Sequence, residues 1–71
     1  MKTRIADLRK ERRLSQEELA AAVQVTRQTI ISIEKEKYVA SLQLAHKISQ
    51  YFGLKIEDVF IFEEDEEDET V

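Results

Sequence analysis

Two short segments of the chain, residues 16–23 and 26–35, have hydrophobic residues at helical spacing. The residues that recur are Leu19, Ala20, Val23, Ile30 and Ile33. A period of three to four residues predicts two amphipathic helices, and it leaves only Gln24 and Val25 for the turn between them. We therefore expect two helices that meet at a sharp corner, where the small side chain of Ala20 allows them to cross closely.

Both helices begin at residues that are suited to capping. Ser15 precedes the first helix and Glu18 follows it by three residues, which is the spacing of a capping box. Thr26 stands where the second helix begins, and its hydroxyl can accept a hydrogen bond from an N–H of the first turn. Two short helices joined in this way are typical of a helix-turn-helix, in which the second helix enters a DNA groove.

The segments on either side of this pair predict further helices. The first helix of the chain is expected to extend from a cap at Thr3 to about Arg12, with Ile5 and Leu8 on its inner face. Leu14 follows this helix and is expected to close the corner before the helix-turn-helix.

A longer helix is expected after a loop at residues 36–40. Ser41 can cap its start, and Gly53 can end it in a left-handed conformation. Its expected inner stripe consists of Leu42, Ala45, Ile48 and Phe52. Ile56, Val59 and Phe60 then indicate a short fifth helix.

The composition supports an all-α fold with one domain. The chain has 71 residues with one Gly, no Pro and no Cys, so disulfides and cysteine-based metal sites are excluded. No apolar stretch is long enough to span a membrane, and the N-terminus lacks the apolar core of a signal peptide. We therefore expect a cytoplasmic protein.

The charge is divided between two regions of the chain. Residues 1–60 carry all 11 Lys and Arg residues and eight of the 15 acidic residues, which makes them +3. The other seven acids are consecutive and turn the formal net charge to −4. The sequence thus predicts a DNA-binding domain at residues 1–62 and an acidic, disordered tail at residues 63–71.

Longer motifs resemble one known family. The stretches SQEELAAAVQVTRQTIISIEKEKY and SLQLAHKISQYFGLKIEDVF are similar to the phage-repressor/Cro-like (XRE-type) helix-turn-helix family of transcriptional regulators. The resemblance covers roughly residues 5–60. It implies a compact five-helix, lambda-repressor-like domain that binds operator DNA and acts as a homodimer, most simply as a repressor.

The polar side chains of the second helix of the motif are the candidate base-reading residues. They are Arg27, Gln28, Thr29 and Ser32. Arg and Gln can recognise guanine and adenine edges in the major groove by paired hydrogen bonds. The competing interpretation is an ordinary solvated polar face, which the position on the groove-entering helix disfavours. Ile31 lies among these residues and could either meet a thymine methyl or be incidental.

Another set of residues is expected to bind DNA phosphates, which position a protein without reading sequence. It consists of Gln16, Thr26, Lys35, Lys37 and Tyr38. By resemblance, Arg9 is expected to form a structural ion pair with Glu34. Gln24 and Glu36 stand where the family usually has Gly, so we expect each to adopt a left-handed backbone conformation.

The apolar run near the C-terminus predicts a dimer surface. We expect the interface to contain Leu44, Tyr51, Val59, Phe60, Ile61 and Phe62. Residues 59–62 are β-prone, and an exposed edge invites pairing, so a short strand could pair with its symmetry mate or with residues 1–3.

Other functions are disfavoured. His46 has no second candidate ligand at metal spacing, and no catalytic arrangement of residues is recognisable, so we expect neither a metal, a cofactor, a small-molecule effector nor an enzymatic activity. Two alternatives stay open. The protein could be a DNA-binding antitoxin or accessory subunit whose main partner is another protein, or a helical interaction module that has lost DNA binding.

Overall fold

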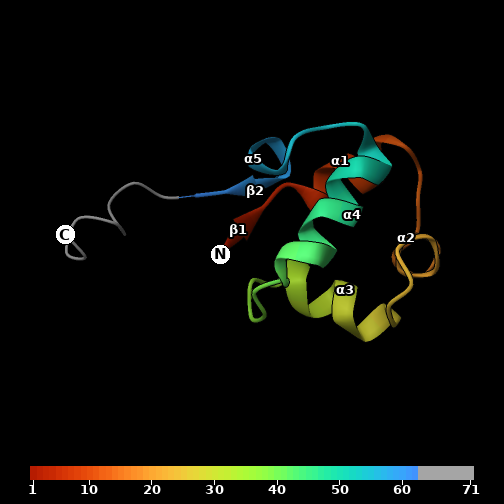
Figure 1. Ribbon diagram of the computed structural model, residues 1–71. Coiled ribbons are helices and arrows are strands. Elements are labelled where there is room, and N and C mark those ends of the chain that lie inside the picture. Colours follow the sequence, from red (N-terminus) through yellow and green to blue (C-terminus); the bar gives the residue numbers. More distant parts are fainter. Residues whose placement is uncertain (63–71) are drawn as a thin grey trace, which may run out of the picture.

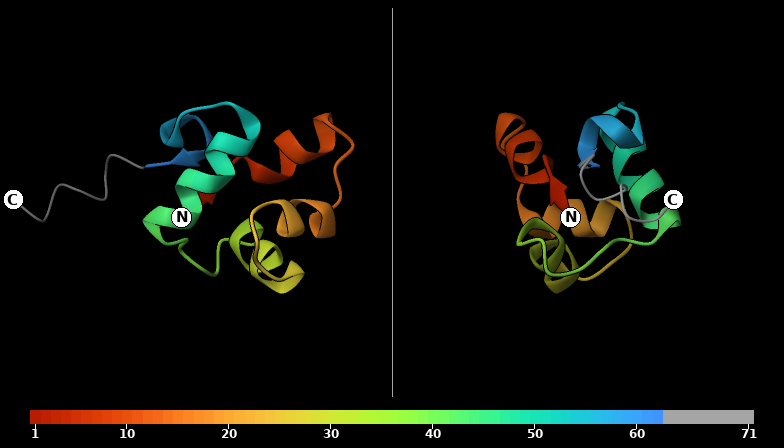
Figure 2. Two further views of the ribbon diagram at one scale, coloured as in Figure 1. Left: turned by 45° about the vertical axis from the view of Figure 1, so that its right-hand side comes forward. Right: turned by 90° about the vertical axis from the view of Figure 1, so that its left-hand side faces the viewer.

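The computed structural model describes residues 1–62, which form five helices and a two-stranded sheet (Figure 1). In chain order the elements are β1 (Lys2–Thr3), α1 (Ile5–Glu11), α2 (Gln16–Ala22), α3 (Arg27–Glu34), α4 (Leu42–Phe52), α5 (Ile56–Val59) and β2 (Phe60–Ile61). In both views of Figure 2, α2 and α3 lie at one end of the molecule and α5 lies at the other. The predicted all-α class and the short C-terminal strand are therefore confirmed.

One hydrophobic core joins the helices. Its buried members are Ile5, Leu19, Ala20, Val23, Ile30, Ile33, Leu44, Ala45, Ile48, Phe52, Val59 and Phe60. All five inner positions predicted for the two helices of the motif are among them, so the helical period there is confirmed. No helix within residues 1–62 is long and apolar enough to cross a membrane.

Three helices start with the side-chain caps that the sequence predicts. The Glu18 backbone N–H donates to the Ser15 hydroxyl at 2.9 Å, and the Ser15 N–H donates to the Glu18 carboxylate at 2.8 Å. The hydrogen bond from the Ser15 N–H is the main cause that keeps the pKa of the Glu18 carboxyl below its usual value, and the Ser15 hydroxyl contributes less. Thr26 accepts from the Thr29 N–H at 3.3 Å, and Ser41 accepts from the Leu44 N–H at 3.1 Å.

The start of α1 differs from the prediction. Thr3 belongs to β1, and Arg4 is the N-cap of α1 without a capping side chain. β1 pairs antiparallel with β2, with Thr3 opposite Phe60, and the Arg4 N–H donates to the Val59 carbonyl at 2.8 Å. The helix thus begins one residue later than predicted, but the Thr3 hydroxyl still accepts a hydrogen bond from the Ile5 N–H of its first turn, at 3.4 Å. The pairing of residues 59–62 with the N-terminus was one of the two predicted arrangements.

Within residues 1–62, four residues have positive φ angles in the left-handed region. Gln24 (φ 65°), Glu36 (φ 63°) and Gly53 (φ 72°) were expected there, and the structure confirms them. Arg13 (φ 54°) was not expected, because neither a Gly nor a family habit marked it.

The predicted inner stripe of α4 is wrong at its first residue. The Leu42 side chain is 79% exposed, whereas Leu44 is 8% exposed and belongs to the core. Leu44, Ile48 and Phe52 follow one another at intervals of four residues and so share a face. At about 100° per residue, Leu42 lies about 160° around the helix axis from Leu44, so its side chain turns toward solvent.

Half of the predicted dimer surface is buried within the chain itself. Leu44, Val59 and Phe60 are at most 8% exposed, because all three side chains belong to the hydrophobic core. They are therefore not available to a partner. Tyr51, Ile61 and Phe62 are exposed, at 41%, 38% and 58%. The prediction of a disordered acidic tail concerns residues 63–71, which lie outside the described part of the chain.

Candidate nucleic-acid interface

The corner between α2 and α3 fixes how α3 is presented. The Val25 N–H donates to the Ala20 carbonyl at 2.9 Å, and the left-handed backbone of Gln24 completes the turn. The Val25 side chain packs against the core. Since Ile30 and Ile33 are also buried, the opposite side of α3 must face outward (Figure 1).

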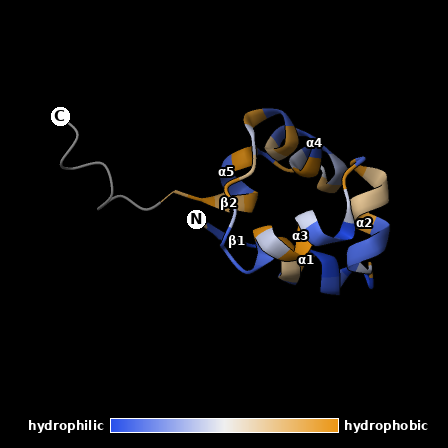
Figure 3. Cartoon of the chain, turned by 90° about the horizontal axis from the view of Figure 1, so that it is seen from below, coloured by the Kyte–Doolittle hydropathy of each residue, from blue (hydrophilic) through white to orange (hydrophobic). Residues whose placement is uncertain are grey.

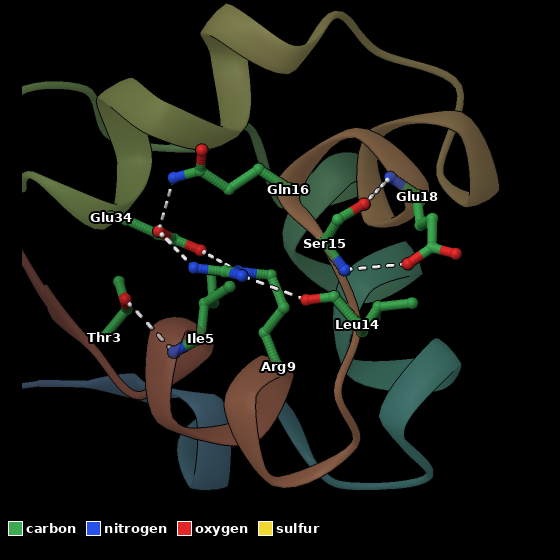
Figure 4. Close-up of polar contacts among 8 residues, drawn as sticks. All are labelled: Thr3, Ile5, Arg9, Leu14, Ser15, Gln16, Glu18 and Glu34. Carbon is green, nitrogen blue, oxygen red and sulfur yellow. Dashed lines mark hydrogen bonds and ion pairs between the residues drawn. The ribbon is translucent and has the colours of Figure 1, made fainter.

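A polar network behind α3 connects it to α1 and α2 (Figure 4). The Arg9 guanidinium donates from Nε to Glu34 Oε2 at 2.8 Å and from Nη2 to Glu34 Oε1 at 3.3 Å. Arg9 Nη1 also donates to the Leu14 carbonyl at 2.9 Å, and Gln16 Nε2 donates to Glu34 Oε1 at 3.0 Å. The predicted Arg9–Glu34 pair is thus present, and it is paired in the two-pronged geometry that is strongest for arginine and a carboxylate.

This network is largely shielded from water. The Arg9 and Glu34 side chains are 13% and 9% exposed. Removing two charged groups from water costs free energy, which offsets much of their attraction. Such a pair therefore fixes the relative placement of its helices more than it adds stability. The contact with Gln16 extends the network to the start of α2, so α1 and α2 both hold the C-terminal end of α3.

The four candidate base-reading residues lie at the N-terminal and outward part of α3. Arg27 and Gln28 are exposed, while Thr29 and Ser32 are half-buried. Gln28 Nε2 lies 3.5 Å from the Ser32 hydroxyl, and the hydroxyls of Thr26 and Thr29 are 3.0 Å apart. Among residues 1–62, the Arg27 guanidinium has no hydrogen-bond acceptor within reach, so its donors are free for an external acceptor.

The structure brings several of these side chains around one hollow. The hollow has a volume of about 380 Å³ and is lined by Thr26, Gln28, Thr29, Ser32, Lys37 and Tyr38. It joins three candidate base-reading residues to three candidate phosphate-binding residues. Arg27, Gln16 and Lys35 do not line it, and the Gln16 amide is directed to Glu34 instead. The Gln16 side chain therefore has one amide hydrogen and its carbonyl left for other contacts.

One basic residue has a contact that the sequence did not indicate. The Arg12 guanidinium donates to the Phe52 carbonyl at 2.8 Å and lies 4.9 Å from the centre of the Phe52 ring. It thus caps the C-terminus of α4, where a cation is favoured. The sequence alone does not show this contact between Arg12 and Phe52, because no local spacing links residues 40 positions apart.

Comparison with known proteins agrees with this geometry. The fold and the outward face of α3 define a DNA-binding transcriptional regulator. The Helix-turn-helix family model matches residues 5–59, and the chain belongs to that family.

The relatives match over nearly their whole length. The chain is 54% identical over 66 residues to an uncharacterized HTH-type transcriptional regulator of Methanocaldococcus jannaschii, covering 93% of this chain and 100% of that one. It is 56% identical over 66 residues to one from Methanothermobacter thermautotrophicus (92% and 96%), and 51% identical over 65 residues to YgzD of Bacillus subtilis (92% and 98%).

A solved structure shows the same fold. The crystal structure of the clp gene regulator ClgR from Corynebacterium glutamicum matches with a TM-score of 0.70 at 20% sequence identity. The match covers 76% of this chain and 57% of that chain.

Proposed function

We propose that this protein is a cytoplasmic repressor that reads operator DNA in the major groove through α3 and binds it as a homodimer. Arg27, Gln28, Thr29 and Ser32 contact base edges. Gln16, Thr26, Lys35, Lys37 and Tyr38 contact phosphates. A bound domain excludes other proteins from the DNA that it covers, which accounts for repression without any chemistry.

The outward face of α3 is the single observation that carries this proposal. It presents exposed Arg27 and Gln28, the two side-chain types that can form paired hydrogen bonds with bases. Behind this face, the Arg9–Glu34–Gln16 network holds the helix in place without using these donors. A helix held in this way can enter the groove with little loss of conformational freedom on binding.

Selection of bound sites from random duplex DNA tests the proposal. We expect a short preferred sequence repeated as two half-sites about 34 Å apart, or a multiple of that distance, because each copy presents one α3 helix. Recovery of no preferred sequence would contradict it.

Single substitutions then test the residues on the selected site. Arg27→Ala and Gln28→Ala should each cost about 1–3 kcal/mol of binding free energy and relax the preference at one base position. Lys37→Ala should weaken all sequences alike, because a phosphate contact carries no sequence information. Lys10→Ala is the matched control: Lys10 is exposed on α1, which lies above α3 in Figure 1, and only a small effect is expected.

The dimer surface must use side chains that the fold leaves exposed. Met1, Val39, Leu42 and Phe62 are 38% to 79% exposed, and with Ala40, Ala45, Ile56 and Phe60 they line one hollow of about 220 Å³. We call the exposed residues Met1, Val39, Leu42 and Phe62 the apolar face. Tyr51 lines a different hollow with Gln24 and Lys47. The apolar face combines projecting side chains with a hollow, which suits the self-complementary contact of a two-fold dimer.

A second function is favoured by the same exposed residues. An apolar face on so small a domain could instead receive a different protein, as in an antitoxin or an accessory subunit. Co-purification of a stoichiometric foreign protein would favour this function. A preparation that contains only this chain, at twice its monomer mass, would favour the homodimer.

A further inference from the structure

The side chain of Ile31 is the one apolar group on the DNA-facing side of α3. It follows Arg27 by four residues and Gln28 by three, and it precedes Lys35 by four, so these side chains are its neighbours on the helix surface. Ile30 and Ile33 occupy the opposite side and are buried.

Ile31 does not belong to the hydrophobic core. Among residues 1–62, the partly buried hydrophobic side chains that pack against the core are Leu8, Leu14, Val25, Ala40 and Ile56. Ile31 is not among them, although it is half-buried by its surroundings. The Ile31 side chain therefore forms an apolar surface beside the candidate base-reading side chains and is not part of the core.

The major groove offers one apolar group that matches this surface. Thymine carries a C5-methyl group there, and the other three bases present polar edges. An isoleucine side chain has no donor or acceptor, and its branch at Cβ restricts it to few rotamers. Contact with a thymine methyl would therefore lose little conformational entropy, whereas contact with a polar base edge would leave that edge without a partner.

We propose that Ile31 is a specificity-determining residue that selects a thymine in each half-site by contact with its C5-methyl group. The thymine lies within reach of the bases that Arg27 and Gln28 contact, because these residues surround Ile31. This inference rests on the proposed function, and it adds an apolar selection to the hydrogen bonds described above.

Replacement of thymine by uracil isolates the methyl group. Uracil keeps every hydrogen-bonding group of thymine, so each thymine of the selected operator can be replaced in turn without changing base pairing. We expect one position in each half-site at which uracil weakens wild-type binding about four-fold, the effect of exposing one methyl-sized apolar group.

Variants of Ile31 connect that position to the side chain. Ile31→Ala and Ile31→Gln should lower the affinity for the thymine operator, and uracil should then cause no further loss at the sensitive position. Ile31→Val keeps the branch at Cβ and should retain part of the discrimination. Thermal unfolding of each variant checks that the fold is intact, and the Gln variant serves if the Ala variant does not fold.

Two results would overturn the role of Ile31. The first is that the wild type is indifferent to every thymine methyl. The second is that Ile31→Ala and Ile31→Gln retain the full uracil effect, whether or not they lower the stability of the fold. Failure to select any sequence from random DNA would instead contradict the proposed function itself.

Discussion

The outward face of α3 and the apolar face are two surfaces that the fold supports in different ways. Behind α3, Arg9, Gln16 and Glu34 form a shielded polar network that fixes the helix. The apolar face has no such support and consists of side chains that the core leaves out, such as Leu42 at 79% exposure. In Figure 3 hydrophobic colouring continues along β2, whereas α2 carries both hydrophilic and hydrophobic colouring.

The two surfaces differ in the kind of partner that their chemistry suits. The polar groups of α3 are already in water and can exchange water for base and phosphate groups. The apolar side chains are stabilised only when something covers them. The proposed function assigns DNA to the first surface and a second copy of the chain to the second.

The largest expected effect comes from making the apolar face polar. Leu42→Ser combined with Phe62→Ser removes two exposed apolar side chains from each copy, so four are lost from the dimer. At about 1.5 kcal/mol each, dimer stability should fall by about 6 kcal/mol, and the dissociation constant should rise by about 10⁴. Sedimentation equilibrium should then show monomers.

A matched control separates this face from other exposed residues. Tyr51→Ser also removes a large exposed side chain, but Tyr51 lines a different hollow, together with Gln24 and Lys47. It should leave the dimer intact. If the Tyr51 variant dissociates and the Leu42/Phe62 variant does not, the interface lies on the Tyr51 side of α4.

The next effect comes from breaking the support of α3. Glu34→Ala leaves the Arg9 guanidinium without its carboxylate in a site where it is 13% exposed, and the free energy of unfolding should fall by about 3 kcal/mol. Urea denaturation measures it. Glu17→Ala, an exposed change on α2, should cost less than about 0.5 kcal/mol.

An apolar replacement of the pair sharpens this test. Arg9→Met combined with Glu34→Leu should recover most of the lost stability, because no charge is left buried without a partner. If Glu34→Ala costs no more than Glu17→Ala, the network does not hold α3.

The smallest effect concerns the link between the two surfaces. Glu36 follows α3 in a left-handed conformation, and Glu36→Gly should stabilise the domain by up to about 1 kcal/mol, because Gly has no Cβ to clash. Lys35→Gly is the control: its φ of −83° needs no Gly, so it should destabilise the domain. Thermal unfolding distinguishes the two, and destabilisation by Glu36→Gly would contradict the strain.

Much of the α3 side of the molecule could be predicted because its determinants are local. Ser15, Thr26 and Ser41 cap helices within three residues of their positions, and the core positions of α2 and α3 follow the helical period. The left-handed conformations at Gln24 and Glu36 were predicted because the family usually has Gly there.

The apolar side was harder to predict because distant contacts decide it. Either Leu42 or Leu44 could extend the apolar stripe of α4, and only the placement of the other helices selects Leu44. Val59 and Phe60 continue the same apolar run as Phe62, yet the first two belong to the hydrophobic core and Phe62 is exposed. The Arg12 cap on α4 likewise joins residues far apart in the sequence.

DNA binding by the outward face of α3 is tested most directly by a titration of the ¹⁵N-labelled protein with operator duplex, followed by amide chemical shifts. We expect the largest shifts at saturation on residues 26–38 and on the Gln16 side chain, with small shifts at Leu42 and Phe62. Largest shifts at Leu42 and Phe62, with residues 26–38 unchanged, would contradict the claim that the outward face of α3 binds DNA.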